Sequence, residues 1–520
     1  MSVDRIAPEL VNVFEPIYLD YLNGAPALKE FYALNPDVKS LLKAANDRHF
    51  VASHRETLVD VLTQQYQGLP STEKVMEQIA KLSQPGTVTV TTGHQLNLCG
   101  GPLYFIYKIL TTIRLAEKLN EAQEEHPVVP VFWMATEDHD WEEVNHFHLS
   151  GKTYKADAWQ GGPVGHQLTH LVAEVLKTVP DLPSFIQEAY ASSKNLSEAT
   201  RKWIHKLFGE QGLVIIDADH TELKRLFIPV MRAELEGQIT RKGVDEASKK
   251  LDAKGYKTQA HARDLNLFYL TLHGRDRIIE AGDHYEILNK DISYTHQALL
   301  EELETHPVKF SPNVFMRPLY QETILPNIAY IGGPAEVAYW LQLKPVFDQL
   351  ELPFPALVPR QNMLYLTKPD QRKMEKLKIS NEALFLDFIE LKKKYIFNEA
   401  GEKFHLAKEE MELKKIFQNI KGLAEEADHT LEAYAGAEEQ KVLKLLDEVK
   451  KKIRKALERK AELELNQLKS VNERVFPNGK TLQERYDNFL QYYIPDHTWI
   501  DTIKKAVDPL DFRFTIVKEE

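Results

Sequence analysis

Residues 88–145 read VTVTTGHQLNLCGGPLYFIYKILTTIRLAEKLNEAQEEHPVVPVFWMATEDHDWEEVN, and this stretch decides the fold. Positions 87–92 are an unbroken run of threonine and valine, a composition typical of a buried strand. The two glycines and the proline at 100–102 then open a run with apolar residues at helical spacing, and a second apolar run covers 128–135. Strand, helix and strand in this order form a βαβ unit, which indicates a parallel sheet and an α/β fold.

Polar residues follow both strands of this unit. Gly93, His94 and Gln95 come directly after the first strand, and residues 137–140 come directly after the second. Because open α/β sheets bind ligands at the carboxyl ends of their strands, we predict the active site here. A tight turn would explain the glycine of the first loop, but His and Gln add donors and acceptors that a plain turn does not need. Lys108, two turns into the helix, is either an anion partner or a solvated residue.

The acidic loop is the stronger of the two signals. It reads Glu137, Asp138, His139, Asp140, and one or two of these acids could simply cap the next helix. A histidine between carboxylates also suits a general base. His146 and His148 lie nearby, yet their spacing matches no standard zinc pattern, so we predict no metal.

A second strand, glycine pair and helix recur later in the chain. Residues 327–331 read as a strand, and Gly332, Gly333 and a proline then open a helix, as Gly101 and Pro102 do in the first unit. We therefore predict two helix N-termini that face one pocket and bind anions. Another predicted strand, 212–217, also ends in acids, at positions 217 and 219.

Three further polar residues lie close to this second unit. Asn313 and Glu336 could be structural, whereas Arg317, in an otherwise apolar run, is placed to grip a carboxylate with both nitrogens. Arg360 ends a short strand predicted at 355–359. Cys99 is expected to be a packing residue, because no basic residue is adjacent to it in sequence.

Length and charge exclude several classes of protein. A chain of 520 residues predicts two to four domains, and a net charge of −12 argues against nucleic acid as the main partner. The first residues have no signal-peptide pattern, and no apolar run reaches the roughly 20 residues needed to span a membrane. A single cysteine excludes intrachain disulfides, so we expect a cytoplasmic protein.

The C-terminal third changes character. Apolar residues repeat at heptad spacing on both sides of Ala435–Gly436, which predicts an antiparallel, coiled-coil-like helical hairpin that turns there. The predicted organisation is a helical segment at 1–86, an α/β core at 87–370 with inserts near 150–210 and 240–310, a helical domain at 371–470, and a segment at 471–520 that returns to the core.

Four motifs, in order along nearly the whole chain, resemble the BshC family of cysteine-adding enzymes of bacillithiol biosynthesis. They are TGHQLNLCGGPLYFIYK (92–108), PVFWMATEDHDWEEVNH (130–146), SPNVFMRPLYQETILPNIAYIGGPAEVAYW (311–340) and FPNGKTLQER (476–485). The resemblance implies a Rossmann-like core with inserted connecting segments, a coiled-coil domain that makes a homodimer, and addition of cysteine to the amine of glucosaminyl-malate. Many members of the family have Gln where this chain has His94.

An amide ligase must activate the carboxyl group, so we expect a nucleotide, ATP or a similar one, to form an acyl-adenylate or acyl-phosphate. Asp138 or His139 would deprotonate the amine, Arg317 or Arg360 would hold the malate carboxylate, and His94 would help the helix N-termini to hold anionic oxygens. The expected catalytic residues are His94, Asp138, His139 and Arg317, and the expected binding residues are Gly93, Gln95, Gly101, Pro102, Lys108, Glu137, Asp140, Asn313, Gly332, Gly333, Glu336 and Arg360. The alternatives are another small-molecule amide ligase or nucleotidylyltransferase, or an inactive dimeric scaffold.

Overall fold

The computed structural model describes residues 2–400, 404 and 406–520. Its centre is a sheet of five parallel strands in the order β13-β12-β2-β3-β6. The bounds of these strands are β2 Val88–His94, β3 Val128–Met134, β6 Val214–Asp217, β12 Asn327–Gly332 and β13 Ala356–Pro359. Counted along the chain, this is the strand order of a doubly wound Rossmann-like sheet, whose direction of winding reverses between β2 and β12.

The predicted βαβ unit is confirmed as β2, α5 and β3. Apolar side chains of the sheet pack against helices, as Val88 and Val90 do against Leu41 of α2 and Leu115 of α5. The helices of the body are α1 Pro16–Leu22, α2 Val38–Asp47, α3 Ala52–Gln65, α4 Glu73–Leu82, α5 Tyr104–Ala122, α6 Trp141–Val144, α7 His170–Lys177, α8 Ser184–Ala191, α9 Leu196–Phe208, α10 Thr221–Gly237, α11 Ile239–Ala253, α12 His296–Thr305, α13 Met316–Ile324, α14 Pro334–Trp340 and α15 Lys344–Gln349.

The two predicted inserts are mixed in structure. The first contains helices α7 to α9 and a two-stranded sheet, which is formed by β4 (His146–Leu149) and β5 (Lys152–Lys155). The second adds an antiparallel sheet in the order β10-β9-β8-β7-β11, and its β7–β8 hairpin closes one side of the functional cavity. Its strands are β7 Leu267–Thr271, β8 Gly274–Ala281, β9 His284–Ile287, β10 Ser293–Thr295 and β11 Phe310–Pro312.

The two ends of the chain meet in a third sheet. Strand β1 (Ser2–Ile6) pairs with β15 (Phe514–Lys518), which pairs in turn with β14 (Met363–Leu366). The N-terminal segment is therefore not purely helical, contrary to the prediction. Strand β14 also lies outside the central sheet, so the central sheet ends at Pro359.

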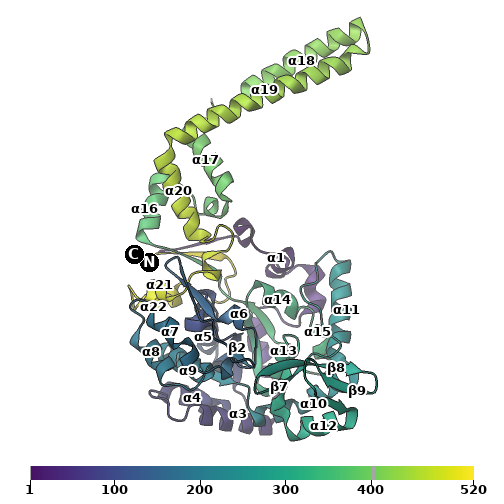
Figure 1. Ribbon diagram of the computed structural model, residues 1–520, viewed down its shortest axis with the longest axis vertical. Coiled ribbons are helices and arrows are strands. Elements are labelled where there is room, and N and C mark those ends of the chain that lie inside the picture. The colour runs from purple at the N-terminus through teal and green to yellow at the C-terminus, as the bar shows by residue number, and fades with distance from the viewer. Residues whose placement is uncertain (1, 401–403, 405) are drawn as a thin grey trace.

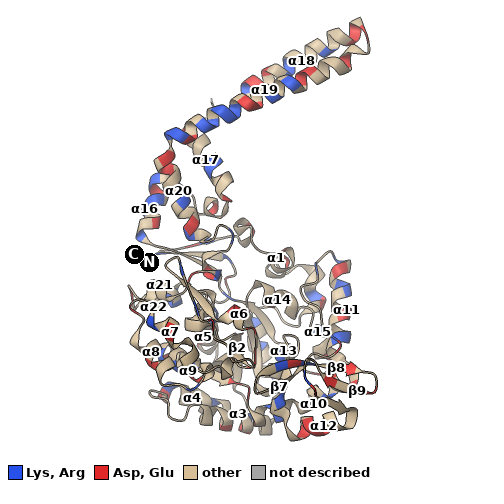
Figure 2. Cartoon of the chain, viewed as in Figure 1, with Lys and Arg blue, Asp and Glu red and all other residues tan. Residues whose placement is uncertain are grey.

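A helical arm extends away from the body (Figure 1). It is a hairpin of α18 (Ala407–Ala427) and α19 (Leu431–Lys460), and charges of both signs alternate along it (Figure 2). The predicted hairpin is present, but the predicted turn at Ala435–Gly436 is wrong, since both residues lie inside α19. The chain turns at 428–430, where the Asp428 carboxylate accepts hydrogen bonds from the backbone N–H and hydroxyl of Thr430.

Of the remaining helices, α16 (Lys368–Leu377), α17 (Phe388–Ala400) and α20 (Glu462–Val475) lie between the arm and the body, whereas α21 (Leu490–Tyr493) and α22 (Trp499–Ala506) pack on the body. Within the described part of the chain, no helix is both long and apolar enough to cross a membrane.

Candidate active site

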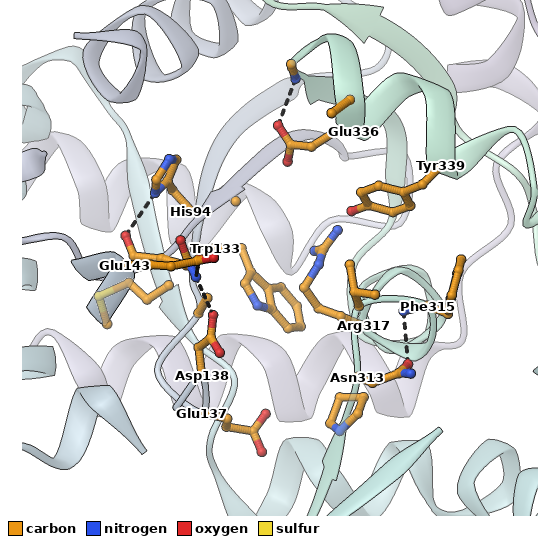
Figure 3. Close-up of a pocket in the computed structure, with 18 of the residues that line it drawn as sticks. His94, Trp133, Glu137, Asp138, Glu143, Asn313, Phe315, Arg317, Glu336 and Tyr339 are labelled. Carbon is orange, nitrogen blue, oxygen red and sulfur yellow. Dashed lines mark hydrogen bonds between the residues drawn. The ribbon is translucent and has the colours of Figure 1, made fainter. Parts of the chain in front are cut away.

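A cavity of about 880 Å³ opens at the carboxyl ends of the central strands. Residues that follow β2, β3, β6, β12 and β13 all line it, and so do residues of the second insert and of the C-terminal segment. The cavity spans the point between β2 and β12 where the winding reverses, which is where doubly wound sheets bind ligands. Figure 3 shows its side chains, with Trp133 between Asp138 on one side and Arg317 on the other.

A buried ion pair ties the end of β2 to α14. The Lys108 ammonium donates to the Gly93 carbonyl at 2.7 Å and lies 2.6 Å from the Glu336 carboxylate. Burial acts to raise the pKa of Glu336, but the Lys108 charge and the Tyr330 hydroxyl hold it at about 2. The charge of Lys108 is therefore neutralised by Glu336, and Lys108 does not offer a free cation to a ligand.

His94 lines the cavity as a neutral imidazole. Burial, and secondly the charge of Lys108, lower its pKa to about 4. Its Nδ1 lies 3.0 Å from the Gln95 carbonyl, which can only accept, so Nδ1 carries the proton and Nε2 is an acceptor. In this protonation state the imidazole offers a ligand an acceptor and no positive charge, and the expected role of His94 with anionic oxygens stays a prediction.

The four residues of the acidic loop separate in space. Glu137 and Asp138 line the cavity, whereas His139 and Asp140 do not, and Asp140 is exposed at the start of α6. His139 packs against Phe268, with its Nδ1 accepting from Arg275 at 3.1 Å. Of the two general-base candidates, only Asp138 can reach a ligand in this cavity.

Asp138 is held by several donors. Its carboxylate accepts hydrogen bonds from the Gln95 side chain and from the backbone N–H of His139, both at 2.7 Å. Burial acts to raise the pKa of Asp138, but the hydrogen bonds from His139 and Gln95, together with the Arg275 charge, bring it well below its usual value. The same Gln95 amide also donates to Glu143 at 2.7 Å, so one amide orients two carboxylates of the cavity.

Among the described residues, Arg317 lines the cavity without a carboxylate partner, as Arg263 and Arg485 also do. It projects from α13 with its guanidinium 5.2 Å from the Tyr330 ring and about 6 Å from those of Trp133 and Trp340. Nη1 donates to Gln321 at 2.9 Å, while Nη2 is buried without a hydrogen-bond partner. Buried guanidinium groups are normally paired, so the open Nη2 indicates a place for a ligand oxygen.

Two other predicted ligand residues have structural partners instead. Arg360 lines the cavity but makes a buried ion pair with Glu484 through two hydrogen bonds of 2.9 and 3.0 Å. Asn313 caps the start of α13, accepting from the backbone N–H groups of Phe315 and Met316. Because Glu484 already neutralises Arg360, Arg317 is the better placed of the two arginines that the sequence offered for the malate carboxylate.

Of the two predicted helix N-termini, only that of α14 lines the cavity, through Gly333. Gly101 and Pro102 do not line the cavity, because the segment around Asn488 covers them. The side chain of Asn488 donates a hydrogen bond to the Gly101 carbonyl at 2.6 Å. Gly332 lies in β12 outside the lining, and the N–H of Gly333 is taken by the Glu336 carboxylate at 2.8 Å.

Cys99 is buried beside this covered loop, as expected for a packing residue. Its N–H donates to the Tyr190 hydroxyl oxygen at 3.1 Å, and its carbonyl accepts from the Asn488 side chain. Burial raises the pKa of the thiol far above its usual value, which removes the thiolate that a nucleophile would need.

Several cavity residues were missed from the sequence. Arg275 and Phe268 come from the second insert and Arg485 from the C-terminal segment, and nothing in their local sequence relates them to the βαβ unit. Asp219 could have been selected, because it follows β6 as Asp138 follows β3, and the same strand-end rule applies to both.

The fold and the site together define a class of protein. The protein is a Rossmann-like α/β protein with a polar ligand cavity at the switch point of its sheet and a coiled-coil arm. Comparisons with known proteins identify the family. Residues 1–361 match the N-terminal Rossmann-like domain of bacillithiol biosynthesis BshC, and residues 363–519 match its C-terminal coiled-coil domain. The chain belongs to the BshC family.

Relatives match along most of their length. A protein of Cytophaga hutchinsonii named "Putative cysteine ligase BshC" is 39% identical over 511 residues, which cover 98% of each chain. A protein of the same name from Christiangramia forsetii is 39% identical, over 99% of each chain. Another, from Bacillus cereus, is 28% identical, over 92% of this chain and 93% of its own. The boundary between the two family domains falls where the chain leaves the central sheet after β13 and enters β14.

Proposed function

We propose that this protein is a ligase that joins the carboxyl group of L-cysteine to the amine of glucosaminyl-malate. Family membership supports the reaction class, and the names of the relatives support cysteine as a substrate. The observation that carries the proposal is the open guanidinium of Arg317, which lies across Trp133 from the Asp138 carboxylate in one cavity. A substrate with a carboxylate at one end and an amine at the other fits these two groups.

In the proposed reaction, a nucleotide such as ATP first activates the cysteine carboxyl group. A carboxylate oxygen attacks a phosphorus atom and displaces pyrophosphate or ADP, which gives an acyl-adenylate or an acyl-phosphate. The sugar amine then attacks the acyl carbon, and AMP or phosphate leaves. Asp138 accepts the proton lost by the nitrogen; because the low pKa of Asp138 makes it a weak base, this transfer follows formation of the C–N bond, and Gln95 holds Asp138 in place for it.

Arg317 would hold the malate portion of the acceptor. Its Nη2 has no partner of its own, and Gln321 fixes the orientation of the guanidinium through Nη1. The three aromatic rings around it exclude water, which strengthens an ion pair with a carboxylate.

We propose further that two copies of the chain pair through the arm and that the protein works in the cytoplasm. The arm exposes a series of large apolar side chains that a monomer leaves in water, namely Met411, Ile416, Ile420, Leu423, Leu431, Tyr434, Leu445 and Val449. Sedimentation of Leu423→Glu should give a lighter particle than the wild type. Leu272→Glu changes an even more exposed leucine outside the arm and should leave the mass unchanged.

The reaction is tested by mass spectrometry of purified protein with cysteine, glucosaminyl-malate and each candidate nucleotide in turn. The proposal expects the amide product with one nucleotide, and little product from Arg317→Ala or Asp138→Asn. The matched control Asp157→Asn, an exposed aspartate outside the cavity, should behave as the wild type does. Product formed with a different amine but not with glucosaminyl-malate would favour another amide ligase, and no product with any nucleotide would favour a scaffold.

A further inference from the structure

An acidic side chain with an unused oxygen lies at the β6 end of the cavity. Asp219 follows β6 and lines the cavity, with only 4% of its side chain exposed. Its Oδ2 accepts a hydrogen bond from Nε2 of His166 at 2.7 Å, and its Oδ1 is buried with no hydrogen-bond partner. A buried carboxylate oxygen without a donor is costly, so this position favours a ligand that donates.

The surroundings of Asp219 favour a positively charged ligand. The nearby Lys224 is fully buried and already engaged, because its ammonium donates to Glu137 and to the Phe310 carbonyl. Asp217 lies beside Asp219 and accepts the backbone N–H of Asp219 at 3.2 Å. Burial raises the pKa of Glu137; the Lys224 charge opposes this rise and the Asp219 charge adds to it, so the two carboxylates are close enough to repel each other.

The acidic end and Arg317 lie on different sides of Trp133. Tyr320 packs edge-on against Trp133 at 5.3 Å, and its hydroxyl donates to the carbonyl of Ala218, the residue before Asp219. The guanidinium of Arg317 lies near the same indole ring, at 5.9 Å. Asp219 and Glu137 therefore lie at the β6 end of the cavity, and Arg317 lies toward β12, where the Glu336 carboxylate is already paired with Lys108.

We propose that Asp219 binds the protonated α-amine of the amino acid donor. This inference rests on the proposed function for the identity of the donor and adds a subsite to it. An amide ligase that joins an amino acid to a second amine must keep the two amines apart. The α-amine of the donor has to stay protonated, because a free α-amine would attack a second activated molecule, whereas the acceptor amine has to lose its proton.

The geometry also places the donor carboxyl where the reaction needs it. Residues 94, 134 and 217 are directly paired across β2, β3 and β6, and neighbouring strands are about 4.8 Å apart. An amino acid whose ammonium group is at Asp219 therefore reaches with its carboxyl over the loop after β3. Asp138, the proposed base, belongs to that loop and lines the same cavity.

Calorimetric titration tests the subsite without requiring turnover. Cysteine is compared with 3-mercaptopropionate, which is cysteine without the α-amine, on the full-length wild type, on Asp219→Asn and on Asp283→Asn, an exposed control on the β8–β9 turn. Asp219→Asn keeps the shape of the side chain but loses its charge. It should weaken cysteine binding by about tenfold or more, the usual loss for a charged hydrogen bond, and should leave 3-mercaptopropionate binding within about twofold.

Three results would overturn the proposal. They are equal losses for both ligands, unchanged cysteine binding by Asp219→Asn, and no wild-type binding of cysteine up to about 10 mM, well above usual Michaelis constants. Failure of the subsite is distinguishable from failure of the proposed function. Product formation together with unchanged binding by Asp219→Asn rejects only the subsite. If Asp219→Asn weakens the binding of cysteine but not of 3-mercaptopropionate, and the wild type forms no product, only the ligase assignment is rejected.

Discussion

Replacement of Arg317 by lysine keeps the positive charge and removes the planar fork. Arg317 can offer a carboxylate the open Nη2 and part of Nη1, with its plane held by Gln321 and the surrounding rings. Lysine offers a single ammonium without that orientation, so at least one charged hydrogen bond is lost. Such a bond contributes about 1.5–3 kcal/mol, which corresponds to a loss of roughly 10- to 150-fold. Arg317→Ala removes the charge as well and should lose more.

The assay compares kcat/KM for glucosaminyl-malate with that for a methyl glucosaminide, which has the amine but no carboxylate. Arg317→Lys should lower kcat/KM by about 10- to 150-fold for the first substrate, chiefly through KM, and by less than about threefold for the second. The control Arg513→Lys alters an exposed arginine paired with Asp511 outside the cavity and should change neither value. Equal losses for both substrates would refute the reasoning, because they would mean that Arg317 does not contact the malate portion.

Three other substitutions test separate features of the structure. His94→Gln should keep activity within about tenfold and leave the pH–rate profile unchanged between about pH 5 and 8, because the pKa of His94 is lowered to about 4 and the imidazole is neutral there; a lost limb in that range would contradict this. Glu322→Gln should gain stability relative to the wild type as pH rises from about 5 to 8, by up to about 3 kcal/mol in urea unfolding. Burial raises the pKa of Glu322 from 4.5 to about 7, so the folded wild type binds more protons than the unfolded chain in this range and loses stability with rising pH; a constant difference between the two proteins would contradict it. Glu484→Gln should lower the free energy of unfolding by about 3–5 kcal/mol, since Arg360 would keep a buried charge without its partner, and a loss below about 1 kcal/mol would show that the pair is not needed.

The sequence was sufficient for the central sheet because the signals there are local. The run of threonine and valine at 87–92, the apolar run at 128–135 and the polar loops after them gave the strands, the direction of the sheet and the position of the cavity. Parallel strands place all their carboxyl ends on one edge, so strand-end residues such as Gly93, Asp138 and Glu336 could be grouped before their contacts were known.

Local signals were insufficient where contacts distant in sequence decide the outcome. Gly101 and Pro102 have the local pattern of an open helix start, yet the segment around Asn488, almost 390 positions away, covers them. Arg360 ends its strand as a ligand residue would, but Glu484 neutralises it from 124 positions away. No local rule predicts such pairs.

The turn of the arm was misplaced for a different reason. A glycine between two heptad runs is a reasonable sign of a break, but α19 continues through Gly436. The turn depends instead on Asp428, whose carboxylate caps the backbone of Thr430. In a long helix, packing against the antiparallel partner outweighs the small cost of one interior glycine.

The most direct test of the central claim is a crystal structure of the protein with glucosaminyl-malate bound. We expect density for the ligand in the cavity between β2 and β12, with a malate carboxylate within hydrogen-bond distance of Arg317 Nη2 and the amine toward Asp138. Density in the other large cavity, beside Tyr365 and Arg474, with the cavity around Arg317 left without ligand, would contradict it.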